Sequence, residues 1–432
     1  MPRKTTLKIK MLLLNLSRYW RQWPATVVFT WLSITAPYVA ADAGDTFNVT
    51  VGTNVIYDSN VFRASTVIPA ERFGSPTRSD LIIISSATVN MRKLLGMQRF
   101  EASGTFADNR YDNHTFLTFF AKNYNAGWAW YLTPYFHGNL TTTHTESLQN
   151  FGLLTGFISS NTRNLRTIDN HRFDAVAEIT RSWHIVGAVS EYVAKNSQGA
   201  VQDFNNSVTS FEGGIRYVSS AGSTLTYTAR HGLGVFMDRP APIVERLFDT
   251  RFNDMEHELR LVWPVTTKTS INARVGHFAR KHAHFAQRDF SGFVGNFDFN
   301  WAITAKTRIT AAWARDLANF QTASNFLFQD FGQFSSSYAT TNRFSLTPVW
   351  QISPKTSVRL RYEYTARDFH GPVLPVVANR SDTTHSGQIA LDWQPLNMLA
   401  VNATLQREHR SSNLFGFDYN VSSGSISAKL NF

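Results

Sequence analysis

GSISAKLNF, residues 424–432, closes the sequence in strict alternation of apolar and polar side chains. Successive side chains of a β-strand point to opposite faces, so the apolar members of this stretch share one face. Those members are Ile426, Ala428, Leu430 and Phe432. The stretch therefore predicts a strand with one fully apolar face and an aromatic last residue.

A strand of this kind at the end of a chain resembles the sorting strand of bacterial outer-membrane barrels. The resemblance implies that the barrel-assembly machinery reads Ile426, Ala428, Leu430 and Phe432 before inserting the protein. We therefore expect a membrane β-barrel in contact with outer-membrane lipid, located in the bacterial outer membrane.

The other end of the chain indicates export. Six basic residues precede an apolar run over residues 25–36, and Ala41-Asp42-Ala43 fits a signal-peptidase site. The apolar run is too short to cross a bilayer as a helix, which needs about twenty residues. We predict a signal peptide over residues 1–43, with cleavage after Ala41 and a start at Met11 as open alternatives.

Composition excludes several other classes. The chain has no cysteine, so lipid acylation and disulfides are excluded, and 43% apolar with 17% charged residues argues against disorder. No apolar stretch after residue 43 is long enough for a membrane helix. The net charge of +11 lies partly in the predicted leader, and without a nucleic-acid motif it does not indicate nucleic acid as a partner.

Aromatic residues recur beside short polar turns along the whole remaining chain. The series is Trp130, Trp263, Trp301, Trp350 and Trp393, with Trp183 and Tyr217 in equivalent places before a turn. Trp and Tyr favour the boundary between hydrocarbon and headgroups, so this series predicts an aromatic girdle on one rim of a barrel.

Alternation then predicts about eighteen strands, with sixteen as the alternative because 185–196 and 223–232 are weak. The predicted strands are 46–58, 80–92, 98–112, 118–131, 135–146, 171–183, 185–196, 207–218, 223–232, 254–264, 269–281, 291–302, 307–317, 338–351, 356–369, 382–394, 398–411 and 417–432. The longer connections are 59–79, 147–170, 233–253, 318–337 and 370–381. Tight turns on one side and long loops on the other are typical of an all-β, up-and-down outer-membrane barrel, with the turns in the periplasm. We predict one barrel domain over residues 44–432 and set aside a soluble propeller or sandwich, whose strands are usually shorter.

Alternation also assigns the inner wall. The residues predicted to line the lumen are Arg172, Arg260, Arg274, Arg359, Arg361, Glu363 and Arg410. They admit two interpretations: a cationic path that attracts anionic or hydroxyl-rich solutes, or arginines that pair with Glu258, Glu363, Glu408, Asp174 and Glu178 across strands.

Signals for catalysis, metal or cofactor binding are weak. The sequence holds no G-x-S-x-G or H-E-x-x-H motif. His277, His282 and His284 gather near a predicted strand end without an obvious carboxylate partner, and we interpret them as a solvated loop cluster. We predict no catalytic residue, no metal and no cofactor.

An ordered series of motifs carries a more specific resemblance. The series is Tyr57-Asp58-Ser59-Asn60-Val61-Phe62-Arg63, Arg99-Phe100-Glu101, Asn109-Arg110-Tyr111-Asp112, Arg172-Phe173-Asp174-Ala175 and Gln406-Arg407-Glu408-His409-Arg410. It resembles the EpsL-type outer-membrane barrel encoded with exosortase/PEP-CTERM exopolysaccharide clusters of Gram-negative bacteria. The resemblance implies a part in exopolysaccharide biosynthesis and supplies no catalytic residue. Its implied partners are the exopolysaccharide and periplasmic or inner-membrane export components.

Three functions remain open. The first is a porin-like conduit that exports the polymer, and the second is an anchoring barrel whose lumen is closed by the loops 59–79, 147–170 or 318–337. The third is a general porin for small solutes.

Overall fold

The computed structural model describes residues 46–149, 151, 162–244, 247–322, 336–371 and 379–432. The predicted signal peptide, residues 1–43, lies outside the described residues. The strands belong to one compact unit, Gly44–Asn431. No helix among the described residues is long and apolar enough to cross a membrane.

Eighteen antiparallel strands form this unit. The first nine are β1 (Phe47–Asp58), β2 (Asp80–Leu95), β3 (Gln98–Tyr111), β4 (Phe119–Thr133), β5 (Phe136–Leu148), β6 (Leu165–Glu178), β7 (Trp183–Asn196), β8 (Asn206–Val218) and β9 (Thr224–Phe236). The second nine are β10 (Arg251–Thr266), β11 (Thr269–His282), β12 (Phe290–Ala302), β13 (Thr307–Thr322), β14 (Ser336–Ser353), β15 (Thr356–His370), β16 (Ser381–Leu396), β17 (Leu399–Ser412) and β18 (Tyr419–Asn431).

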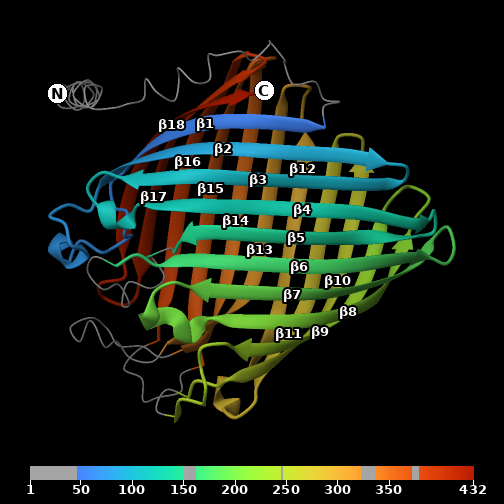
Figure 1. Ribbon diagram of the computed structural model, residues 1–432, viewed down its shortest axis with the longest axis horizontal. Coiled ribbons are helices and arrows are strands. Elements are labelled where there is room, and N and C mark those ends of the chain that lie inside the picture. The colour runs from blue at the N-terminus through green and yellow to red at the C-terminus, as the bar shows by residue number, and fades with distance from the viewer. Residues whose placement is uncertain (1–45, 150, 152–161, 245–246, 323–335, 372–378) are drawn as a thin grey trace. The chain divides into compact units, whose positions relative to one another are not determined.

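Each strand pairs with its neighbours in sequence, and β1 also pairs with β18, which closes the sheet into a barrel. Figure 1 shows the near and far walls crossing steeply, as tilted barrel strands require. The predicted fold class is confirmed, with eighteen strands and not sixteen. The two weak segments 185–196 and 223–232 are the strands β7 and β9.

One predicted strand was misplaced. The segment 171–183 is β6, but it begins at Leu165 and ends at Glu178, and a turn follows over residues 179–182. Trp183 therefore opens β7 after the turn instead of closing the strand before it. The error arose because the half of β6 nearest the long loop carries polar residues on both faces, so alternation of apolar and polar residues does not mark it as a strand.

The outer wall carries apolar side chains near the short turns. Trp183, Trp263, Trp301, Trp350 and Trp393 are all exposed there, as is Tyr217. This rim agrees with the predicted aromatic girdle. Trp130 departs from it, because its ring packs between Phe136 and Phe173 and is only 5% exposed.

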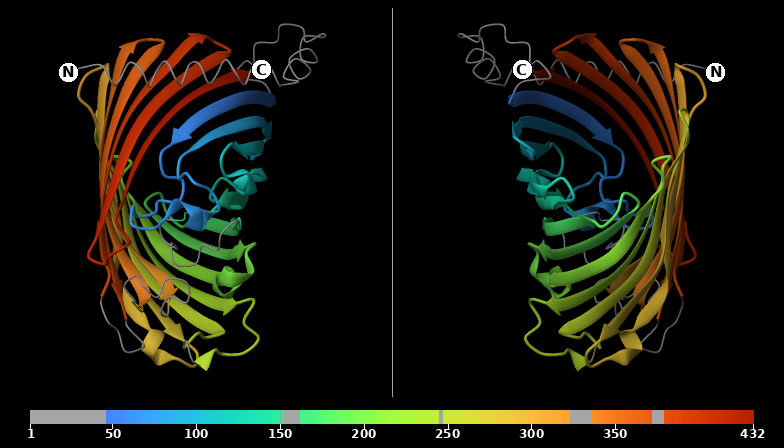
Figure 2. Two further views of the ribbon diagram at one scale, coloured as in Figure 1. Left: turned by 90° about the vertical axis from the view of Figure 1, so that its left-hand side faces the viewer. Right: turned by 90° about the vertical axis from the view of Figure 1, so that its right-hand side faces the viewer.

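The strand ends at the opposite side are joined by longer loops. The loop after β1 folds over its neighbours around Phe62, which is fully buried and stacks on Phe73 of the short helix η1 (Ala70–Phe73). Leu117 and Phe151, from the next two loops, complete this cluster. Figures 1 and 2 together place this blue loop across that mouth of the barrel.

An apolar outer wall with an aromatic rim is unfavourable in water, because it leaves many apolar side chains exposed. A sheet closed on itself satisfies its own backbone hydrogen bonds, which is the condition for crossing lipid with strands. The chain is an outer-membrane β-barrel.

Candidate functional site: the inner wall

The interior face of the barrel is built from every second residue of each strand. Directly opposed residues share a face, so Arg260 and Arg274, which are paired in register, point the same way. Glu363 opposes Ser345 and Ser386 in the same manner, which places it on the same inner face as its strand neighbours Arg359 and Arg361. Register places all seven predicted residues on this face, Arg172 and Arg410 included, and they are not isolated there.

Arg274 is the centre of a first inner-wall cluster. Its guanidinium donates to Glu256 through Nη2 and to Glu258 through Nε. Arg230 also pairs with Glu256, and Arg260 lies 2.7 Å from Glu258. The two carboxylates are nearly buried and pair with three arginines, so most of the charge along β9, β10 and β11 is compensated.

Arg172 makes a bidentate contact with Glu212. Its Nη1 and Nη2 lie 3.0 and 3.2 Å from the two carboxylate oxygens. The pair reaches from β6 to β8 over the intervening strand, because side chains on a concave wall converge. Asp174, predicted as a partner, lies 3.8 Å from Arg172 Nε and is the weaker contact.

A second inner-wall cluster lies on β14, β15 and β16. Arg361 Nη2 lies 2.5 Å from Glu363, and Arg343 Nε lies 3.4 Å from the other oxygen of that carboxylate. Arg359 Nη2 lies 2.7 Å from Asp392. The pairing interpretation agrees with the contacts of Glu258, Glu363 and Asp174. Of the other predicted partners, Glu178 contacts His137 and Glu408 accepts a hydrogen bond from Tyr419. The partners Glu212, Glu256 and Asp392 were not predicted.

Arg410 lies on the predicted inner face, but its side chain is covered there instead of open to the lumen. It is 3% exposed, its Nε donates to the carbonyl of Phe417 at 2.7 Å, and its guanidinium lies over the ring of Tyr419. Asp382 and Arg380 pack beside it, with Nη2 of Arg380 donating to Asp382 at 2.6 Å. Arg410 thus packs the loop-side end of the barrel wall.

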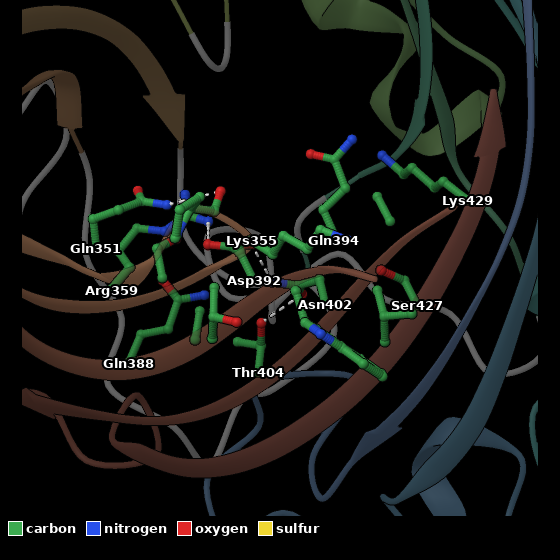
Figure 3. Close-up of a pocket in the computed structure, with 17 residues that line it drawn as sticks. Gln351, Lys355, Arg359, Gln388, Asp392, Gln394, Asn402, Thr404, Ser427 and Lys429 are labelled. Atoms are coloured by element: carbon green, nitrogen blue, oxygen red, sulfur yellow. Dashed lines mark hydrogen bonds and ion pairs between the residues drawn. The ribbon is translucent and has the colours of Figure 1, made fainter. Parts of the chain in front are cut away.

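The second cluster borders a polar cavity of about 550 Å³ near the short turns (Figure 3). Arg359 and Asp392 contribute from β15 and β16, and Asn402 donates to Asp392 at 2.8 Å. Amide, hydroxyl and ammonium groups complete the lining. They include Gln351, Lys355, Gln388, Gln394, Thr404, Ser427 and Lys429.

Sequence reasoning missed most of this cavity. The alternation of residues 424–432 already placed Ser427 and Lys429 on the polar face, which is the signal that could have found them. Five adjacent strands, β14 to β18, contribute to this one cavity, and their alignment depends on register, which alternation does not give.

The histidines do not form a metal site. Among the residues with described positions, no group of three or more His, Cys, Asp or Glu side chains could hold a metal ion. The prediction that they lack carboxylate partners was wrong. Nδ1 of His282 lies 3.4 Å from Asp289, and Nδ1 of His284 lies 2.9 Å from Asp249. Both contacts hold loop backbone in place, while His277 faces outward beside Phe293.

The motif at Tyr57–Arg63 shapes a loop. Asp58 accepts hydrogen bonds from the backbone N–H of Asn60 and from Arg63, and Asn60 donates to the carbonyl of Ala64. Arg63 adopts a left-handed backbone with φ of 47°. The motif therefore folds the segment that carries Phe62 into its cluster.

The three loops predicted to close the lumen have different outcomes. Loop 59–79 is packed across one mouth of the barrel, as described above. Loop 147–170 is shorter than predicted, since β6 begins at Leu165, and most of it lies outside the described residues. Most of loop 318–337 also lies outside them.

Comparisons with known proteins add no family. No family model matches the chain, and no curated protein matches it. Among solved structures, the outer membrane protein OpdK of Pseudomonas aeruginosa is 10% identical, with a TM-score of 0.48 over 89% of this chain and 99% of that one. OccAB3 of Acinetobacter baumannii is 7% identical, with a TM-score of 0.45 over 89% of this chain and 99% of its own. The siderophore receptor PirA of Pseudomonas aeruginosa is 10% identical, with a TM-score of 0.42 over 91% and 81%. Likeness at this level carries no argument about solutes or activity.

Proposed function

We propose that this chain is a passive conduit through the outer membrane for hydroxyl-rich, weakly charged solutes, saccharides among them. The observation that carries the proposal is the ion pairing of the inner wall. Arginines and carboxylates alternate there, and each cluster contains charges of both signs.

Such a wall suits hydroxyl groups, which both donate and accept hydrogen bonds. A paired guanidinium still has N–H groups to donate, and a paired carboxylate still has lone pairs to accept. Because pairing compensates most of the charge, the field that acts on an ionic solute is weakened. Weak contacts at many points allow a solute to enter and also to leave.

Barrel size is compatible with passage. Porins of roughly sixteen to eighteen strands leave an aqueous channel, whereas smaller barrels fill their interior with side chains. The loop cluster around Phe62 narrows one mouth, and the polar cavity beside Arg359 lies toward the other end. Of the three functions open from the sequence, a porin-like conduit for small polar solutes has the most support.

Export of an exopolysaccharide is the narrower form of the same proposal. It rests on the resemblance of the motif series, and it stays a prediction. The barrel would then need export components to deliver the polymer, as the resemblance implies. An anchoring barrel with a closed lumen is the competing class.

The test is single-channel conductance of the refolded protein in a planar bilayer, with neutral linear maltodextrins added to either side. We expect discrete open steps that maltodextrin interrupts in a concentration-dependent way. The paired variant Arg359→Ala/Asp392→Ala keeps the charge balance and should shorten the blocks. A folded barrel without conductance would support the anchoring class and refute the conduit.

The same recording separates a conduit for the polymer from a porin for small solutes. The purified exopolysaccharide of the host, added to the side of the short turns, should block long-lived open steps if the polymer is the solute. Block by maltodextrin without block by the polymer would leave a small-solute porin and would contradict export.

A further inference from the structure

A belt of basic side chains lies on the outer wall between β9 and β18. We define the outer belt as Arg315, Arg407, His257, His277, His385 and His409. Register places all six outward. Arg407, for example, opposes Gly387 and Ser422, and its strand neighbour on the same face is Leu405, which is 68% exposed. The pairs His257–His277 and His385–His409 are directly opposed.

The outer belt lies one membrane thickness from the tryptophan rim. Arg315 and Arg407 are each eight residues from the short-turn ends of their strands, Thr307 and Leu399. Eight residues of a strand tilted by about 40° rise about 20 Å, close to the height of the apolar band of such barrels. With the short turns in the periplasm, the belt is level with the headgroups of the outer leaflet.

No carboxylate compensates the outer belt. In the described parts of β9–β18, register turns every Asp and Glu inward except Asp368, which lies near the loops and accepts a hydrogen bond from Ser381. The inward set is Asp254, Glu256, Glu258, Asp298, Asp316, Glu363, Asp382, Asp392 and Glu408. On β3–β7, by contrast, Asp108, Glu146, Asp169 and Glu191 face outward.

The belt side chains are held in position by neutral partners. Arg315 donates to the carbonyl of Phe293 at 3.2 Å and to Asn342 at 3.1 Å, neither of which removes its charge. Nδ1 of His385 and of His257 each lie 2.9 Å from a tyrosine hydroxyl, those of Tyr362 and Tyr227. Arg407 is exposed and forms no hydrogen bond or ion pair with the described residues.

We propose that the outer belt binds the phosphate groups of a phosphorylated glycolipid in the outer leaflet. Guanidinium forks match phosphate oxygens, and phosphate contacts of this kind are charge-assisted. Tyrosine hydroxyls and histidine nitrogens beside them offer contacts to sugar hydroxyls. Below the belt, Leu405, Ile389 and Leu360 are exposed and offer an apolar surface to the acyl chains.

The charge distribution makes the binding one-sided. The wall of β3–β7 carries outward carboxylates among its cations, so it attracts a phosphate less than the wall of β9–β18 does. We therefore assign the lipid to one wall of the barrel and leave the opposite wall to other lipids or proteins.

The test is native mass spectrometry of the full barrel in detergent, titrated with lipid A, the phosphorylated acylated glucosamine disaccharide. We expect the double variant Arg315→Gln/Arg407→Gln to bind lipid A about five- to thirty-fold more weakly, since each surface cation contributes about a factor of five. Lys122→Gln/Lys195→Gln removes the same charge from the outward face of β4 and β7, and it should bind like the parent. Heat-modifiable migration on a gel confirms that each variant is folded.

Two further probes identify which groups of the lipid the outer belt recognises. Lipid A stripped of its phosphates should bind the parent as weakly as lipid A binds the double variant. Phosphatidylglycerol carries phosphate without the disaccharide, and equal affinity for it would overturn the assignment to a glycolipid. Equal losses in the belt variant and the Lys122/Lys195 control would overturn the site.

Discussion

Asp249 and His284 connect two loops of the barrel, with Oδ1 of the acid 2.9 Å from Nδ1 of the imidazole. The acid lies just before β10 and the histidine follows β11. The backbone N–H of Phe285 donates to the same carboxylate at 3.1 Å. Asp80 and His114 repeat the arrangement eight strands earlier, at 2.8 Å, between the first residue of β2 and the loop after β3. The same contact thus ties one loop to the next at two places on the rim.

The Asp249 contact makes this rim sensitive to acid. Burial would raise the pKa of Asp249, but hydrogen bonds from His284 and from backbone N–H groups outweigh it and lower the pKa to about 2 from its usual 3.8. A folded-state pKa below the unfolded value means that the ionised carboxylate stabilises the loops above about pH 4. That contribution is lost as the pH falls toward 2. The protection factors for hydrogen exchange in the loops after β9 and β11 should therefore fall between pH 4 and pH 2.

Asp249→Asn should reproduce the acid effect at neutral pH. The amide still accepts some hydrogen bonds but lacks the charge, and a hydrogen bond to a charged group contributes about 1.5–3 kcal/mol. We expect lower protection factors in both loops at pH 7 and little further change in them with acid. Unchanged protection in the variant would contradict the role of this carboxylate, whereas exchange in the β-strands serves as the internal control.

Arg274→Met should make the channel more selective for cations. The variant removes one positive charge and leaves Glu256 and Glu258 with Arg230 and Arg260 as their remaining partners. The reversal potential in a KCl gradient measures the change. Arg407→Met removes the same charge from the outer wall, so it should leave the reversal potential unchanged.

A charge-restoring pair separates electrostatics from folding. Arg274→Met/Glu258→Gln returns the inner wall to its original net charge and should return the selectivity toward that of the parent. A persistent shift in this double variant would show that Arg274 acts by shaping the lumen rather than by its charge.

The strands could be predicted wherever lipid touches the barrel. A bilayer penalises polar groups on the outer face, so alternation is strict near the short turns and the turn positions were found within a few residues. Toward the long loops the outward side chains become polar and strict alternation ends. β6 was misplaced there because Thr167, Asp169 and His171 occupy its outward face, and β13 and β14 run further toward the loops than alternation indicates.

The inner wall could be predicted residue by residue but not pair by pair. The face to which a side chain points depends only on alternation, which is why Arg274 and Arg359 could be assigned to the inner wall. Partners depend on register and on curvature, which bring Glu212 of β8 to Arg172 of β6 across a whole strand. Arg410 was assigned to the lumen because alternation does not show where the loops cover the wall.

Ile426→Lys tests the outer face of the closing strand. Ile426 lies opposite Val55 of β1 and Ala403 of β17, and it is 64% exposed on the outer wall. A lysine there would meet lipid, at a cost of about 2–4 kcal/mol near the midplane. We expect a lower midpoint of urea unfolding in lipid vesicles.

Ser427→Lys is the matched control for that substitution. Ser427 is the next residue of β18, and it lines the polar cavity beside Lys429. A lysine at this position meets water, so its urea midpoint should stay near that of the parent. Equal losses for both variants would contradict the facing of the closing strand.

Gly138→Ala should disrupt the packing of β5 against β6 beside Trp130. A Cβ at Gly138 would lie 1.9 Å from the carbonyl oxygen of Asp174 and 2.6 Å from Cζ2 of Trp130. The indole could rotate away, but the carbonyl belongs to the backbone of β6 and is fixed by the sheet. We expect a large loss of heat-modifiable, folded barrel after refolding.

The double variant Trp130→Ala/Gly138→Ala should not recover the folded barrel, because the backbone contact remains. Gly104→Ala in β3 provides the comparison, since a Cβ there meets no atom within 4 Å, and its folded fraction should match the parent. Recovery in the double variant would instead assign the requirement for glycine to the stacked indole.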